Sequence, residues 1–288
     1  MVSVIIPALN EEETIANVVS FCLSQNDVSE VIVVDDKSVD NTVAAALEAG
    51  AKVITSTRLG KGISMKDGML FASNDILVFL DGDIFPYPED TISKLTRPIL
   101  ENEYDFVKAT FSRNAGRVTE LVAKPLLSIF YPELSVFSQP LSGMIAGRKS
   151  LFEKVDFLSD YGVDIGILID MFLQKARITE VNIGYIENKS KPWQELGKMS
   201  KEVARAIITK AMAVRRETVT LEELESMTVI KDQMEFALRE QVVGLKKMVV
   251  FDMDNTLLRG RFIDTAAATF GFDPYLKQLR ASETDPVI

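Results

Sequence analysis

Short apolar runs alternate with amphipathic segments along the first part of the chain. Apolar positions in these segments recur at helical spacing, as after the first run, where Ile15, Val18 and Cys22 share one face. Four runs have the composition of buried strands: Val2–Ile6, Val31–Val34, Lys52–Thr55 and Ile76–Leu80. Strands and helices in this alternation predict an α/β fold with a mainly parallel sheet flanked by helices.

The pattern becomes less regular after Asp83. Three further strands are predicted over Asp105–Phe111, Met144–Gly147 and Ile178–Ile186. Helical spacing covers Arg117–Phe130, where Pro125 should interrupt the helix because proline has no N–H donor. Additional helices are predicted after Gly162 and from Met199 to about Glu217.

The strongest candidate for chemistry is a pair of carboxylates that follows the run Ile76–Leu80. Asp81 and Asp83 flank Gly82, and side chains two positions apart in an extended strand point the same way. Two hard oxygen ligands at the carboxyl end of a buried strand suit a divalent metal that holds a diphosphate. The competing interpretation is a solvated surface turn.

Polar stretches also follow the first two strands, at Pro7–Glu11 and Asp35–Asp36. Parallel strands bring their carboxyl ends to one edge of a sheet, where a nucleotide would find groups for its base and ribose. The alternatives are structural. Asn10 can cap the next helix while Glu13 reaches back to it, and Asp36 can be a turn residue.

Three further positions offer groups for an anion or a hydroxyl. The segment Arg58–Gly62 is predicted to be a flexible basic loop. Lys61 lies between its two glycines and could reach a phosphate, although the full P-loop pattern is absent. Arg113 and Arg117 bracket the start of a helix, where amides and guanidinium groups suit a carboxylate or phosphate; a solvated loop is the alternative. Asp164 either begins a helix or accepts a hydrogen bond from a sugar.

Composition narrows the chemistry. A net charge of −10 argues against nucleic-acid binding, and 47% hydrophobic residues support a large core. The chain has no histidine, so a metal would have oxygen ligands, which favours Mg²⁺ or Mn²⁺ over zinc. The single cysteine, Cys22, excludes a disulfide framework, and no apolar run approaches the roughly 18 residues of a membrane span. We expect a cytoplasmic protein without a transmembrane segment.

A second unit is predicted toward the carboxyl end. After a first domain at residues 1–217, a charged helix with a capping box at Thr220 and Glu223 forms a linker over residues 218–245. Met248–Phe251 then has the composition of a new buried strand and is followed directly by Asp252. This strand lies at the start of the predicted second unit, residues 246–288. About thirty residues follow, too few to complete an α/β domain.

The motifs of the first domain resemble the nucleotide-sugar half of GT-A glycosyltransferases, which have a Rossmann-like sheet. The shared motifs are Pro7–Glu12, Val34–Ser38, Gly60–Gly62 and Asp81–Asp83. Later segments resemble the glucosyl-3-phosphoglycerate synthase family: Gly116–Leu127, Gln139–Gly143, Tyr161–Gly166, Val181–Gly184 and Glu195–Ser200. The resemblance covers about residues 1–210, with the motifs in the family's order.

This resemblance implies a retaining transfer of glucose from a nucleotide sugar, usually UDP-glucose, to the 2-hydroxyl of 3-phosphoglycerate. It also implies a homodimer. Implied nucleotide contacts are Pro7, Ala8, Leu9, Asn10, Glu11, Asp36, Lys61, Asp81 and Gly82. Implied metal ligands for Mg²⁺ or Mn²⁺ are Asp83, Asp81 and Asn188. Implied acceptor contacts are Gly116, Arg117, Thr119, Ser190 and Lys191. The implied catalytic residues are Lys61, Asp83, Arg117 and Asp164, the last in place of a glutamate near the glucose.

The chain departs from the family after the last predicted strand. Asn188 replaces a metal-binding histidine; its carbonyl oxygen can bind metal, but it cannot shuttle protons. Lys191 replaces an arginine and lacks the bidentate fork, and Ile186 also stands where an arginine is usual. Two alternatives therefore stay open: a related enzyme with another anionic or lipid-phosphate acceptor, and a nucleotide-sugar-binding protein without transfer activity.

The segment Asp252-Met253-Asp254-Asn255-Thr256 resembles the first motif of haloacid-dehalogenase-type phosphatases. The resemblance implies that Asp252 is a nucleophile and Asp254 an acid/base in an amino-terminal fragment of such a domain. A synthase fused to this phosphatase would convert its phosphorylated product to glucosylglycerate, a product of the compatible-solute type.

Overall fold

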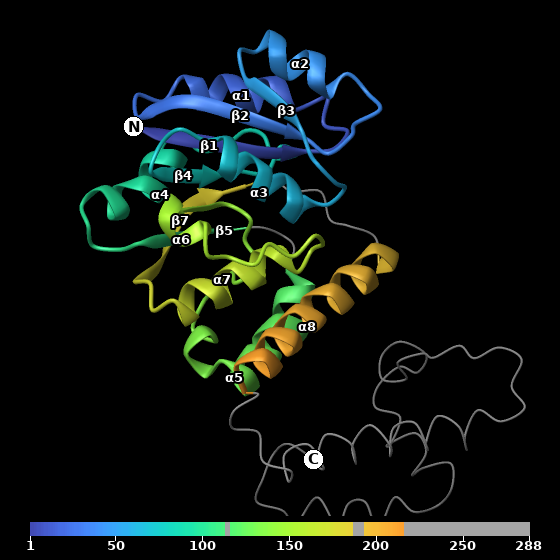
Figure 1. Cartoon of the computed structure of the whole chain (residues 1–288), viewed down its shortest axis with the longest axis vertical. Coiled ribbons are helices and arrows are strands. Elements are labelled where there is room, and N and C mark those ends of the chain that lie inside the picture. Colours follow the sequence, from blue (N-terminus) through green and yellow to red (C-terminus); the bar gives the residue numbers. More distant parts are fainter. Residues whose placement is uncertain (113–115, 187–192, 216–288) are drawn as a thin grey trace, which may run out of the picture. The chain divides into compact units, whose positions relative to one another are not determined.

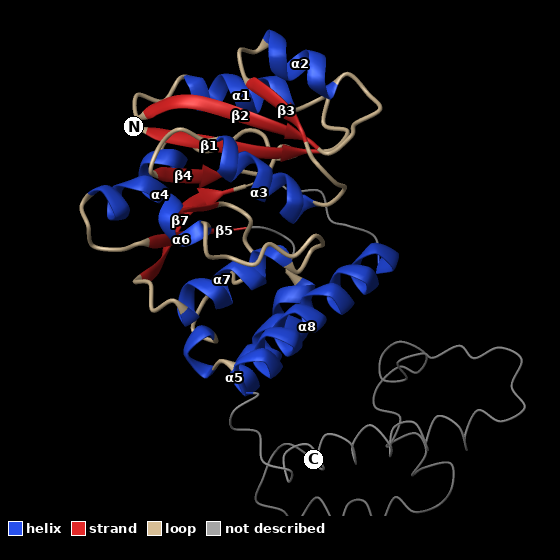
Figure 2. Ribbon diagram, in the orientation of Figure 1, coloured by secondary structure: helices blue, strands red, loops and turns tan. Residues whose placement is uncertain are grey.

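The computed structural model describes residues 1–112, 116–186 and 193–215. Seven strands form one sheet in the order β3-β2-β1-β4-β6-β5-β7 (Figure 2). Their bounds are β1 Val2–Ala8, β2 Val28–Asp35, β3 Lys52–Thr55, β4 Ile76–Phe79, β5 Phe106–Ser112, β6 Ile145–Arg148 and β7 Ile178–Tyr185. The seven strands predicted for residues 1–217 are present, and the mainly parallel α/β sheet is confirmed; the predicted strand Met248–Phe251 lies outside the described residues.

The helices fall between and after these strands in the predicted alternation (Figure 1). Their bounds are α1 Ile15–Leu23, α2 Thr42–Glu48, α3 Lys61–Phe71, α4 Thr91–Leu100, α5 Lys124–Phe130, α6 Lys149–Phe152, α7 Val163–Leu173 and α8 Trp193–Arg215. A π-helical turn, Thr119–Ala123, precedes α5, and a 3₁₀ turn, Pro132–Leu134, follows it. No helix among the described residues is long and apolar enough to cross a membrane.

Strand β1 lies inside the sheet and pairs in parallel with β2 on one side and β4 on the other. Strand β6 is the exception to the parallel arrangement, because it runs antiparallel to both β4 and β5. The parallel strands β1, β2 and β4 therefore bring their carboxyl ends to one edge. That edge carries the three polar stretches singled out in the sequence.

Both faces of the sheet are buried, as continuous apolar strands require. Strand β1 shows the alternation: Ile5 belongs to one core cluster, and Val4 and Ile6 belong to the other. Helices α3, α5, α6, α7 and α8 cover the first face. Helices α1, α2 and α4 cover the second, where Cys22 is buried.

Local structure differs from the predictions at three places. Strand β4 ends at Phe79, so Gly82 and Asp83 lie in a turn and not in the extended conformation that the argument for converging carboxylates assumed. Helix α1 starts at Ile15, and Asn10 does not cap it; the Asn10 backbone is left-handed, with φ of 58°. The interruption predicted at Pro125 falls one turn earlier, because the π-helical turn Thr119–Ala123 leads directly into α5 and Pro125 lies in the first turn after it.

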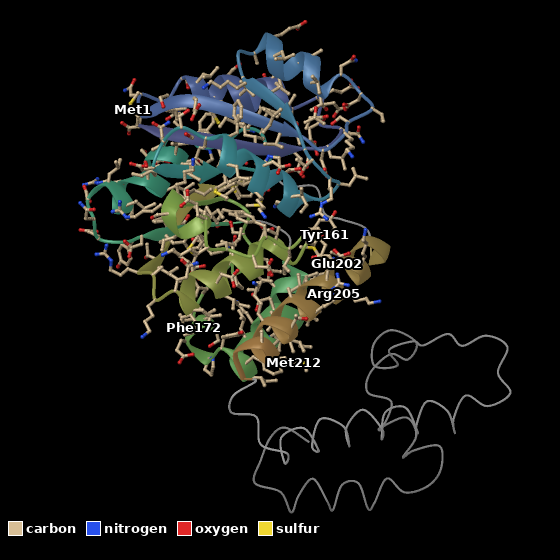
Figure 3. All side chains as sticks on the ribbon, in the orientation of Figure 1. Met1, Tyr161, Phe172, Glu202, Arg205 and Met212 are labelled. Atoms are coloured by element: carbon tan, nitrogen blue, oxygen red, sulfur yellow. The ribbon has the colours of Figure 1, made fainter. Side chains whose placement is uncertain are left out.

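Helix α8 packs against both α5 and α7 beyond the sheet (Figure 1). Toward its carboxyl end, the Lys210 ammonium lies 2.7 Å from one Asp170 oxygen on α7. Nearer its start, Glu202 accepts a hydrogen bond from the Tyr161 N–H, and Arg205 pairs with Asp160; Figure 3 labels Tyr161, Glu202 and Arg205. These contacts fix α8 beside the loop that leads into α7.

Candidate active site

A cavity of about 560 Å³ lies at the carboxyl edge of the sheet, a volume suited to a small-molecule ligand. It brings together segments that are far apart in the sequence. The predicted site residues that line it are Pro7, Ala8, Leu9, Glu11, Asp36, Lys61, Asp81, Gly82, Asp83, Gly116, Arg117, Thr119 and Asp164. This edge is the expected ligand position in a parallel α/β sheet.

The turn that carries Asp81 and Asp83 is held by backbone hydrogen bonds to two side chains. The Tyr87 hydroxyl donates to the Asp81 carbonyl at 2.8 Å and accepts from the Asp81 N–H at 3.1 Å. Thr14 donates to the Gly82 carbonyl at 2.7 Å. Tyr87 is buried, and its ring stacks on Phe21. The turn is thus preorganised, with both carboxylates at the cavity wall.

Lys61 opens helix α3, and it is not part of the flexible loop that the sequence predicted. Gly60 has φ of 127°, and a Cβ on Gly60 would lie 2.1 Å from the Ser159 carbonyl oxygen. A Cβ on Gly62 would lie 1.7 Å from the Leu158 carbonyl oxygen. The two glycines therefore allow close backbone packing. Asp36 completes the arrangement, because both of its carboxylate oxygens accept from the Gly60 N–H.

The ammonium of Lys61 lies between two carboxylates. It is 3.0 Å from Asp81 Oδ1 and 3.1 Å from Asp164 Oδ2. Burial alone would lower the pKa of Lys61, but Asp164 and Asp81 outweigh this effect and hold that pKa well above its usual value. The side chain is therefore a permanent cation at the centre of the cavity wall.

The turn Gln139–Gly143 forms another part of the wall, and its role was not predicted. Because Gly143 has no side chain, its backbone can lie close to the charged groups of Lys61 and Asp81. A Cβ at this position would lie 2.6 Å from Lys61 Nζ and 2.9 Å from Asp81 Oδ1. Lys108, on β5, is fully buried and donates to the Ser142 carbonyl at 2.8 Å. The sequence offers one signal for Lys108, a lysine within an apolar strand. Its partners could not be predicted, because they lie far away along the chain.

The loop after β1 is held by the loop after β2 and by the first residue of α2. The Glu11 N–H donates to Thr42 Oγ1, and the Asn10 N–H donates to Ser38 Oγ. The Asn10 side chain accepts from the Val39 N–H at 2.9 Å. Asn10 is the predicted nucleotide residue, among those described, that does not line the cavity. Its part in nucleotide binding stays a prediction.

Three of the five predicted acceptor residues, Gly116, Arg117 and Thr119, also line the cavity. Gly116, with φ of 138°, leads into Arg117 and Thr119, and Thr119 begins the π-helical turn. The start of α8 faces the same space and supplies residues that sequence reasoning had not assigned roles. These are Leu196, Lys198, Met199 and Glu202.

Several predictions lie outside the described residues: Asn188, Ser190, Lys191, Asp252 and Asp254, together with the linker 218–245 and the fragment 246–288. Ile186 is described. Its side chain is 1% exposed and packs in the core, so it offers the cavity no polar group in place of an arginine.

The residues present fit a hard divalent cation. Asp81 and Asp83 supply carboxylate oxygens from one constrained turn, the ligand type that Mg²⁺ and Mn²⁺ prefer. No group of three or more acidic, histidine or cysteine side chains gathers within residues 1–112, 116–186 and 193–215. Such a metal commonly takes its other ligands from substrate phosphates and water.

A parallel sheet with an Asp-x-Asp turn and a lysine at its carboxyl edge defines a nucleotide-sugar-dependent glycosyltransferase of the GT-A fold. Residues 3–157, more than half of the chain, match the family described as glycosyl transferase family 2. The chain belongs to this family.

Within that family, it is similar to glucosyl-3-phosphoglycerate synthases. The enzyme of Mycobacterium tuberculosis (strain CDC 1551 / Oshkosh) is 37% identical over 237 residues, which cover 73% of each chain. A crystal structure of the M. tuberculosis enzyme with Mn²⁺, UDP-glucose and phosphoglyceric acid has a TM-score of 0.70 at 37% identity, covering 73% of this chain and 79% of that one. Another, with Mg²⁺ and UDP, has a TM-score of 0.69 at 37% identity and the same coverage. The predicted family and fold are confirmed.

Proposed function

We propose that this protein transfers glucose from UDP-glucose to the 2-hydroxyl of 3-phosphoglycerate and retains the sugar's configuration. The observation that carries the proposal is a single cavity shared by the Asp81–Asp83 turn, Lys61, Asp164 and Arg117. The M. tuberculosis relative has UDP-glucose, Mn²⁺ and phosphoglyceric acid together in one of its crystal structures.

The donor would lie along the carboxyl edge of β1, β2 and β4. Pro7, Ala8, Leu9 and Glu11 would contact the nucleoside from the first loop, with Asn10 supporting that loop through its bond to Val39. Asp36, already bound to the Gly60 N–H, would link the nucleoside end to the start of α3. Asp164 would accept from a glucose hydroxyl.

The chemistry requires stabilisation of the diphosphate as it leaves. A Mg²⁺ or Mn²⁺ ion held by Asp83, Asp81 and Asn188 would neutralise charge on the departing diphosphate. Lys61 would act on the same charge from the end of α3, and its high pKa keeps it cationic. A preorganised cation needs no rearrangement at the moment of reaction, so this wall would supply much of the rate enhancement.

The acceptor would be held on the opposite wall. The Gly116 amide, Arg117 and Thr119 would bind its phosphate or carboxylate. Ser190 and Lys191, which lie outside the described residues, are the other acceptor contacts that the resemblance implies. Held there, the 2-hydroxyl could attack from the face that the diphosphate leaves. Positioning would replace a protein nucleophile.

A second acceptor class is favoured by one observation. Ile186 stands where the family has an arginine, and its side chain is buried in the core. One anion contact of the family is therefore replaced by an apolar group. Another phosphorylated or anionic acceptor is the alternative that the experiment must include.

The test is an acceptor screen with labelled UDP-glucose and Mg²⁺ or Mn²⁺. The panel contains 3-phosphoglycerate, 2-phosphoglycerate, glycerate, other phosphorylated small molecules and a lipid phosphate. We expect a glucosylated product with 3-phosphoglycerate, and Asp83→Ala should abolish it while circular dichroism shows an intact fold. Asp90→Ala, which removes an exposed carboxylate on another loop, is the matched control. Donor hydrolysis without acceptor preference would defeat the proposal.

Three further properties are part of the proposal. A homodimer is supported by the resemblance and is tested by light scattering during gel filtration. A cytoplasmic location is supported by the sole cysteine, Cys22, which is buried as a free thiol.

A phosphatase-type role for Asp252 and Asp254 is supported by their motif. Its test is phosphate release from the synthase product by the natural protein, which Asp252→Asn should abolish.

A further inference from the structure

Lys108 is a charged side chain inside the core, and the proposed reaction gives it no role. It lies on β5 with 0% of its surface exposed. Its ammonium donates to the Ser142 carbonyl at 2.8 Å, lies 3.5 Å from the Asp164 carbonyl, and faces the Phe106 ring at 5.9 Å. These groups are dipoles and a ring face, and no carboxylate of residues 1–112, 116–186 or 193–215 forms a direct ion pair with the ammonium to offset the burial of its charge.

The two carbonyl groups belong to two separate walls of the cavity. Ser142 ends the turn that begins at Gln139, and Asp164 lies in the first turn of α7. One ammonium group therefore connects β5, the turn and the helix beneath the cavity. The turn is also fixed at its other end, because the Glu180 carboxylate accepts from the N–H groups of Ser138 and Gln139.

The positions of these walls matter because of what they carry. Gly143 follows Ser142 and sits against both Lys61 and Asp81, at the distances given above for an added Cβ. Asp164 reaches Lys61 with its side chain at 3.1 Å while its carbonyl faces Lys108. A shift of either wall would therefore move the partners of the lysine that is to meet the diphosphate.

Burial of a lone ammonium is costly, and stability alone does not favour it. Taking a cation out of water costs several kcal/mol unless it is well paired, and an apolar side chain of similar volume is often as stable or more stable. Burial also lowers the pKa of Lys108 to about 8, against the opposing effect of Asp164 and Glu180. A residue that costs stability in this place calls for a role in the site.

We propose that Lys108 is a positioning residue that holds the Ser142–Gly143 wall against the amino end of α7, and so sets the places of Asp164 and Lys61 for the sugar end of the donor. The inference rests on the proposed function. It concerns a residue that does not itself touch the substrate.

The first test compares Lys108→Met with Lys149→Met. Lys149 also donates to a backbone carbonyl, that of Ala72 at 2.7 Å, but it does not line the cavity, so it is a matched control. We expect Lys108→Met to keep or raise the melting temperature and to lower kcat at least tenfold, since misplacement by about 1 Å can cost a factor of 100. We expect Lys149→Met to leave kcat and KM unchanged.

The second test measures binding and does not depend on turnover. UDP alone should bind Lys108→Met with wild-type affinity, while the extra affinity of UDP-glucose over UDP should fall about 3- to 10-fold, the worth of one hydrogen bond. Glu180→Gln loosens the same turn. It should lower the extra affinity of UDP-glucose over UDP by a smaller factor in the Lys108→Met background than in the wild-type protein.

Each outcome is decisive. Wild-type kcat and wild-type UDP-glucose affinity in Lys108→Met would overturn the proposal. So would a loss of kcat that only follows a lower melting temperature, or failure of both Lys108→Met and Lys108→Gln to fold. If wild type transfers no glucose to any acceptor, the proposed function fails, but the binding comparison still decides the role of Lys108.

Discussion

The ammonium of Lys61 lies 3.1 Å from the carboxylate of Asp164, a residue 103 positions later in the chain. The same ammonium lies 3.0 Å from Asp81. One side chain thus joins the start of α3, the end of β4 and the start of α7 at a single point of the cavity wall. Two carboxylates hold the cationic group that would stabilise a leaving diphosphate.

Replacement of Lys61 by methionine should remove this charge while keeping most of the side-chain volume. We expect kcat to fall about 100-fold or more, the usual cost of losing one group that stabilises transition-state charge. Radiometric transfer assays at saturating donor would measure it. Lys66→Met, on the exposed face of the same helix, is the control. Turnover within threefold of wild type would rule out a role for Lys61 at the diphosphate.

Replacement of Tyr87 by phenylalanine should loosen the Asp81–Asp83 turn without disturbing the core. The hydroxyl bonds both the N–H and the carbonyl of Asp81, and the ring would still stack on Phe21. We expect Mn²⁺ affinity in the presence of UDP to weaken about 3- to 10-fold, the equivalent of one or so hydrogen bonds. Electron paramagnetic resonance of free Mn²⁺ would measure this affinity. Tyr104→Phe, at a half-buried position beside the same core, should leave it unchanged.

Replacement of Gly143 by alanine should displace Lys61 with little effect on the fold. The new Cβ would lie 2.6 Å from Lys61 Nζ, and the end of a lysine side chain can move away. We expect the melting temperature to change little and kcat to fall at least tenfold. The control is Gly197→Ala, where a Cβ meets no atom within 4 Å and alanine favours the helix. An active Gly143→Ala enzyme would show that the contact is not needed.

The free energy of unfolding should decrease as the pH falls below 4.5, because the stabilising charge of Glu30 is lost there. Burial alone would raise the pKa of Glu30, but hydrogen bonds from Lys52, Ser3 and the Ser73 N–H outweigh it and lower the pKa to about 2. Because the folded-state pKa is depressed, this stabilisation is present above pH 4.5 and is lost as the pH falls toward 2. The full contribution is about 3 kcal/mol.

Urea denaturation followed by circular dichroism would test this dependence. Wild type should exceed Glu30→Gln in free energy of unfolding at pH 7, and the difference should shrink at pH 3. Glu153→Gln, an exposed residue, is the control. A difference that stays constant with pH would mean that the ionised carboxylate is not the source of the stability.

The order of elements and much of the cavity could be predicted because they depend on local patterns. The runs Val31–Val34 and Ile76–Leu80 predict strands buried on both faces, whatever packs against them. The carboxyl ends of parallel strands share an edge, so Asp36 and Asp81 had to lie near one another.

The predictions failed where a contact joins residues remote in sequence. Asn10 has the composition of a helix cap, but Ser38 and Val39 from the next loop compete for its groups and prevail. The glycines beside Lys61 predict flexibility when read locally; the backbone of Leu158 and Ser159 gives them a packing role.

The sequence by itself determined the strands, the acidic pair after β4 and the lysine of the site, because hydrophobic period and residue chemistry act within a few positions. Only the tertiary structure decided that Lys108 is buried, that Tyr87 holds Asp81, and that Gly143 admits Lys61. The partners of Lys108 lie 34 and 56 positions away, and no local pattern encodes such a meeting. These contacts exist only in the folded protein, where the turn and the start of α7 both meet Lys108 of β5.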